Sequence, residues 1–156
     1  MKPKMNRKDL MDNDDIWNAV NSVLSEQDFP TEDEKVNDAF LVFQYYSEME
    51  SGGHEALLNW TQQYIKEVGI QHYQNGLVGS LEKIGAHDCA AIERTHLEEL
   101  WKLHLALEND ESHEEEYYSK IELMDNAYHG QDGKLETLLE GYFVEIHTDL
   151  IDVVEE

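Results

Sequence analysis

Apolar residues recur at helical spacing along almost the whole chain, from Ile16 to Val153. Spacings of three and four residues place side chains on one face of an α-helix, whereas a half-buried strand needs strict alternation. Such alternation is hard to find in this sequence. The 156 residues are 40% hydrophobic, which suits one domain with its own core. We therefore predict an all-α, single-domain bundle of about seven helices.

Turn residues divide this pattern. Thr31 followed by Glu34 forms a capping box, which predicts that a helix begins there. Ser51-Gly52-Gly53 interrupts the pattern, and Gly69 and Gly85 are placed to end the helices before them. The polar residues 109–116 are expected to form an exposed link. The apolar segments of the expected helices are 16–24, 39–46, 57–68, 70–84, 88–107, 117–128 and 135–153. The large side chains expected in the core are Phe40, Phe43, Trp60, Leu81, Trp101 and Phe143.

Acidic residues outnumber basic ones by 35 to 11, and the formal net charge is −24. Four of the basic residues, Lys2, Lys4, Arg7 and Lys8, precede every acidic residue. We expect residues 1–9 to form a flexible basic tail and residues 10–156 to form the acidic helical domain. Charge of one sign at this density destabilises a compact chain and creates a long-range field. The field favours a basic protein partner and disfavours direct binding of nucleic acid or of an anionic membrane.

The single cysteine, Cys89, excludes an intrachain disulfide and fits a reducing compartment. It lies beside two alanines on a helical face, so we expect a buried and inert thiol. No apolar run approaches the roughly 20 residues needed to span a bilayer. These observations predict a cytoplasmic protein.

Motifs of enzymatic chemistry are absent from the sequence. It has no glycine-rich phosphate loop followed by Lys, no HExxH, no cysteine pair for zinc and no EF-hand loop. Glu93 and His96 form its one Glu-x-x-His pair, whereas di-iron bundles need two such pairs and two further Glu. We predict no catalytic residue, no cofactor and no metal. A metal-dependent helical-bundle enzyme that uses Glu93 and His96 is the alternative. His54 is expected to hydrogen-bond the local backbone, and His104 to be a core histidine.

The candidate partner-binding residues are acidic and fall into clusters along the chain. A solvated surface explains any one cluster. Taken together, the clusters give the chain a net charge much larger in magnitude than the value of about 2 to 8 that is usual for small domains. Duplex DNA carries one charge per roughly 1.7 Å, a density that carboxylates along several helices can approach. The candidates are Glu32, Asp33, Glu34, Asp38, Glu48, Glu50, Glu111, Glu114, Glu115, Glu116, Glu136, Glu140 and Glu145.

Two helix junctions resemble a known family. Residues 45–55 run from an aromatic helix into a Gly-Gly turn, and 81–86 end a helical hairpin in Ile-Gly-Ala before Ala90-Ala91-Ile92. These stretches resemble the small acidic family of bacterial proteins named after DNA mimic protein nineteen, otherwise a domain of unknown function. The resemblance covers residues 36–101. Ser51 and Leu57-Leu58 depart from the family, which usually has Asn and aromatic residues there.

The resemblance implies an all-helical fold, often dimeric, whose founding member blocks a helix-turn-helix repressor by imitating DNA. The acidic residues by which that mimic binds its partner cannot be aligned residue by residue with this chain. From charge and resemblance together we expect a non-enzymatic acidic protein that binds a DNA-binding transcription regulator. A homodimer, and an interaction module whose acidity serves only solubility, both remain open.

Overall fold

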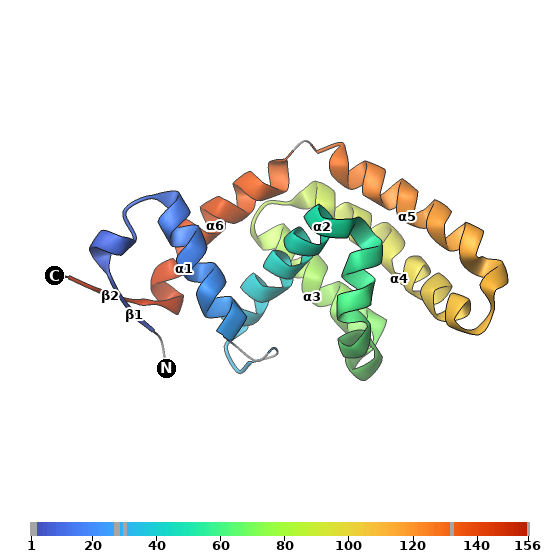
Figure 1. The fold of residues 1–156 in the computed structure, drawn as a ribbon, viewed down its shortest axis with the longest axis horizontal. Helices are drawn as coiled ribbons and strands as arrows, with labels where there is room; N and C mark the ends of the chain where they lie inside the picture. Colours follow the sequence, from blue (N-terminus) through green and yellow to red (C-terminus); the bar gives the residue numbers. More distant parts are fainter. Residues whose placement is uncertain (1–2, 27–28, 30, 132, 156) are drawn as a thin grey trace.

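The computed structural model describes residues 3–26, 29, 31–131 and 133–155. In this part of the chain six α-helices form an elongated bundle (Figure 1), which confirms the all-α fold class. The helices are α1 (Asn13–Glu26), α2 (Glu34–Val68), α3 (Ile70–Lys83), α4 (His87–Asn109), α5 (Glu114–His129) and α6 (Lys134–Leu150). The shorter elements are β1 (Lys4–Asn6), β2 (Asp152–Val154) and the 3-10 turns η1 (Arg7–Asp9) and η2 (Glu111–His113).

Helix α2 contains the predicted break at the Gly-Gly pair, but it is assigned as one kinked helix, so six helices replace the expected seven. The backbone leaves helical geometry at Gly53 (φ 73°, ψ −158°) and re-enters it at once. The start of α2 also differs from the prediction. Asp33 is the N-cap, because its side chain accepts a hydrogen bond from the backbone N–H of Lys35 at 2.9 Å. Thr31 instead forms a turn before the helix, where its Oγ1 accepts from the backbone N–H of Asp33.

Two glycines with positive φ end helices as predicted. Gly69 (φ 92°) is the single residue between α2 and α3. Gly85 (φ 86°) follows α3, where its N–H donates to Glu82 and the next N–H, of Ala86, donates to Leu81. This pair of bonds is the Schellman arrangement, which needs a residue that tolerates positive φ. Helix α3 consequently packs between α2 and α4.

Strands β1 and β2 pair at one end of the molecule, beside the packed pair α1 and α6 (Figure 1). Lys4 of β1 lies opposite Asp152 of β2 in a parallel pair, and Arg7 forms an ion pair with Glu155. Residues 4–6 therefore pair with the C-terminal strand, within the segment 1–9 that was expected to be a flexible basic tail. The ion pair of Arg7 joins this basic segment to Glu155, which directly follows β2. Residues 1 and 2 lie outside the described part of the chain.

The core runs through all six helices, and three of the six predicted core side chains are buried in it. Leu81 and Phe143 are fully buried, and Trp101 is 5% exposed. Phe40 and Phe43 are half-buried at the edge of the core. Trp60 was predicted wrongly, because 72% of its surface is exposed. The second part of α2 presents a neighbouring stripe to the core instead. After His54, the side chains that it buries are Leu57, Leu58, Thr61 and Ile65.

None of the described helices is both long and apolar enough to cross a membrane.

Candidate functional site

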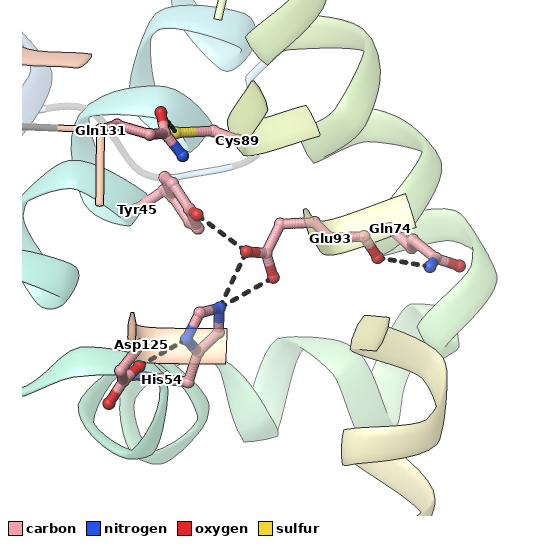
Figure 2. Close-up of polar contacts among 7 residues, drawn as sticks. All are labelled: Tyr45, His54, Gln74, Cys89, Glu93, Asp125 and Gln131. Atoms are coloured by element: carbon pink, nitrogen blue, oxygen red, sulfur yellow. Dashed lines mark hydrogen bonds and ion pairs between the residues drawn. The ribbon is translucent and has the colours of Figure 1, made fainter. Parts of the chain in front are cut away.

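A buried polar cluster joins three helices at the kink of α2 (Figure 2). Its position depends on Gly53, whose backbone passes close to α5. A Cβ atom on Gly53 would lie 2.3 Å from Oδ2 of Asp125, nearer than any real contact of a Cβ atom. Glycine is thus required by the positive φ and by the space, and it places His54 at the start of the second part of α2.

The His54 imidazole lies between two carboxylates from different helices. Its Nε2 is 2.8 Å and 3.1 Å from the two carboxylate oxygens of Glu93 on α4, and its Nδ1 is 2.6 Å from Oδ1 of Asp125 on α5. The backbone N–H of His54 also donates to Oδ1 of Asp125, at 2.9 Å. His54 and Glu93 have no solvent-exposed surface. The prediction that His54 hydrogen-bonds the local backbone was therefore wrong, because its ring nitrogens contact side chains of α4 and α5.

The charge of His54 follows from this geometry. Burial by itself lowers the pKa of His54, but the Glu93 charge and the hydrogen bonds with Asp125 and Glu93 outweigh it and raise the pKa to about 9. At neutral pH His54 is an imidazolium, and both ring nitrogens donate. The cluster then has one positive charge between two negative ones.

Glu93 also receives hydrogen bonds from outside this pair. The Tyr45 hydroxyl donates to Oε2 of Glu93 at 2.7 Å, and the side-chain amide of Gln74 donates to the Glu93 backbone carbonyl at 2.8 Å (Figure 2). Burial and the Glu93 charge raise the pKa of Tyr45 well above its usual value, so its hydroxyl keeps its proton. The cluster therefore links both parts of α2 with α3, α4 and α5.

Access from solvent distinguishes a structural cluster from a reactive one. Three surface cavities are lined by described residues, and His54, Glu93 and Asp125 line none of these three. A fully buried imidazolium with both nitrogens engaged has no free position for a substrate atom. The arrangement fits a cluster that fixes the helices relative to one another.

The side chains of Glu93 and His96, the Glu-x-x-His pair, do not face a common site. Glu93 faces His54, whereas Nδ1 of His96 lies 2.8 Å from Nζ of Lys120. Burial and the Lys120 charge lower the pKa of His96. Within the described ranges, no three His, Cys, Asp or Glu side chains are grouped so as to hold a metal ion.

Cys89 and His104 have the environments that were predicted. Cys89 is fully buried, and burial raises the pKa of its thiol to about 12. Its Sγ lies 3.1 Å from Oε1 of Gln131. His104 is 8% exposed, stacks on Trp101 and has Nε2 3.2 Å from Oε1 of Gln62.

The thirteen acidic candidates differ in how far they are exposed and in whether they bind neighbouring residues. Asp38 is half-buried and binds Lys83 and Ser80, and Asp33 caps α2. Glu48 is half-buried, and its pKa is raised by that burial. Glu140 is half-buried on α6. The exposed members are Glu32, Asp33, Glu34, Glu50, Glu111, Glu114, Glu115, Glu116, Glu136 and Glu145.

Most Lys and Arg side chains of the described residues form ion pairs. Each partner is a carboxylate, and the nitrogen-to-oxygen distances are 3.6 Å or less. The paired basic residues are Arg7, Lys35, Lys66, Lys83, Arg94, Lys102, Lys120 and Lys134. In contrast, no acidic residue from Asp110 to Glu116 has an ion-pair partner in the part of the chain that is described. We call these five residues, Asp110, Glu111, Glu114, Glu115 and Glu116, the acidic junction.

Comparisons with protein-family models, with curated proteins and with solved structures found no match to this chain. The family resemblance stays a prediction from the sequence.

The sequence contained one sign of the buried cluster. Glu93 lies four residues after Cys89 and four before Leu97, on the apolar stripe of α4. A carboxylate on such a stripe needs a buried partner, because an unpaired buried charge is strongly unfavourable. Nothing local identified His54 or Asp125 as that partner.

Proposed function

We propose that this chain is a non-enzymatic acidic binding protein that occupies the basic surface of a DNA-binding regulator and excludes DNA from it. The acidic junction between α4 and α5 carries this proposal. Its five acidic residues fall within seven positions, and all five are exposed. The three in the first turn of α5 also stabilise that helix through its dipole.

The charge density of the junction is comparable with that of DNA. Seven residues of helix and 3-10 turn rise about 10 to 14 Å, which leaves roughly one negative charge per 2 to 3 Å. Duplex DNA has one charge per about 1.7 Å of its axis. A surface that binds phosphates through Lys and Arg would meet a similar field here. Charge complementarity of this kind acts mainly on the association rate and on partner choice.

The first experiment identifies a partner. The full chain is used as bait in extract from its native cell at low and at high salt. A captured DNA-binding protein is then purified, and its association with this chain is measured at about 0.01 M and 0.15 M salt, where the Debye length is about 30 Å and 8 Å. We expect association to slow steeply between these two conditions.

Two matched variants test which charges matter. The substitutions Glu111→Gln, Glu114→Gln, Glu115→Gln and Glu116→Gln remove four charges from the junction and keep its shape. The control removes four exposed charges dispersed over the molecule, by Asp14→Asn, Glu26→Gln, Glu67→Gln and Asp152→Asn. We expect the junction variant to associate at least about tenfold more slowly than the control. A third variant, with Glu136→Gln, Glu140→Gln and Glu145→Gln, tests the face of α6 in the same way.

Competition with DNA decides between a mimic and a general acidic adaptor. Duplex DNA and this chain should exclude each other from the partner. A stable ternary complex, with DNA still in the partner's DNA-binding surface, would refute the proposal.

A further inference from the structure

A cavity of about 210 Å³ lies where the C-terminal end of α5 meets the N-terminal end of α6. Helix α2 contributes Tyr46 and Glu50 to its lining, α5 contributes Tyr128, and α6 contributes Glu136. Pockets for drug-sized ligands and cofactors usually measure about 300 to 1,000 Å³. This cavity is therefore suited to a single side chain.

The cavity joins two acidic clusters that are far apart in the sequence. Burial and the charges of Glu136 and Glu50 raise the pKa of the Tyr46 hydroxyl. The Tyr128 hydroxyl donates a hydrogen bond to Oε2 of Glu50, at 3.1 Å. The two carboxylates and the two aromatic rings thus line the same small space.

The lining has more acidic than basic side chains. Lys134 is its one Lys or Arg among the described residues, and the Nζ atom of Lys134 lies 3.3 Å from Oδ2 of Asp88. Glu50 and Glu136, which also line the cavity, have no ion-pair partner within the described ranges. A cation that enters the cavity would therefore meet two carboxylates that no basic side chain of the described residues neutralises.

We propose that this cavity binds the guanidinium group of an arginine side chain, and that the basic partner supplies this arginine. That the partner supplies this arginine rests on the function proposed above. Guanidinium is planar, donates to carboxylates in a fork and stacks on aromatic rings, whereas the ammonium of lysine is a compact and strongly hydrated point charge. Two carboxylates beside two tyrosines match the first chemistry better than the second.

The test uses the full chain and three small probes: the N-acetyl amides of arginine, lysine and citrulline. Citrulline has the shape of arginine without its charge. Binding is followed by NMR shifts of the Tyr46 and Tyr128 ring signals. We expect saturable shifts with the arginine probe, binding at least several-fold weaker with the lysine probe, and none with the citrulline probe.

Matched double variants locate the binding. Glu50→Gln with Glu136→Gln should weaken arginine binding about tenfold or more, because two charged hydrogen-bond acceptors are lost. Glu140→Gln with Glu145→Gln changes the net charge equally but leaves the lining intact. Equal binding of arginine and lysine, or equal weakening by both double variants, would overturn the proposal.

This test and the test of the proposed function fail separately. A ternary complex with DNA would refute mimicry and leave the probe titration unchanged. A failed probe titration would refute the arginine cavity and leave the kinetics of the acidic-junction variant unchanged.

Discussion

Gly53 and Asp125 are packed so closely that a Cβ atom on Gly53 would lie 2.3 Å from the Asp125 carboxylate. The same glycine has a φ of 73° and a ψ of −158°, a region that only glycine occupies readily. Two separate constraints therefore act on one residue, and both serve to place His54 between Glu93 and Asp125.

Gly53→Ala should lower the free energy of unfolding by more than Gly69→Ala does. Gly69 is the matched control, because it also has positive φ and extended ψ, but a Cβ atom there would meet nothing within 4 Å beyond its chain neighbours. The backbone strain alone costs about 1 to 3 kcal/mol in each variant. Displacing Asp125 should cost at least about 1 kcal/mol more. Urea denaturation of both variants measures the difference, and equal losses would contradict a role for the Asp125 contact.

The pKa of His54 predicts a pH dependence of stability. This pKa is about 9 in the folded protein, above the value of about 6.5 for an unfolded chain. The folded protein binds the proton more tightly, so the stabilisation is complete below pH 6.5, decreases as pH rises, and is lost above pH 9. His54→Gln removes this contribution. The stability difference between wild type and this variant should shrink by about 1.4 kcal/mol per pH unit from pH 7 to 9.

Urea denaturation at several pH values measures that difference, and His87→Gln, at an exposed histidine, is the control. Removing the buried cation destabilises the fold by about 3 to 5 kcal/mol, which can prevent folding. A second measurement therefore uses the wild type alone. The ¹⁵N shifts of the His54 ring should be those of an imidazolium at pH 7.5. Neutral imidazole shifts at that pH would contradict the assigned charge.

Phe143 and Phe43 differ in how far their side chains are buried. Phe143 is fully buried, with its ring centroid 5.1 Å from that of Trp17, whereas Phe43 is half-buried. Phe143→Ala should lower the free energy of unfolding by about 3 to 5 kcal/mol. Phe43→Ala should cost less, since part of its surface already contacts water. Chemical denaturation compares them, and a larger loss at Phe43 would contradict the packing described here.

The helices could be predicted from short stretches of the sequence. Periodicity located them, and Gly69 and Gly85 ended them as expected, because positive φ is a property of single residues. The rotation of a helix is less well determined. The sequence of the second part of α2 offers two adjacent apolar stripes, and the structure buries the one that leaves Trp60 exposed, with α3 packed against α2.

The sequence by itself thus determined the all-α class, the helix positions and the acidic character, since these depend on composition and on neighbours along the chain. Tertiary structure alone decided which groups from distant segments meet. It placed His54, Glu93 and Asp125 together, paired Lys4 with Asp152, and brought Glu50 and Glu136 to one cavity. Contacts of this kind depend on how whole helices pack, and no local pattern encodes the partner of a buried charge.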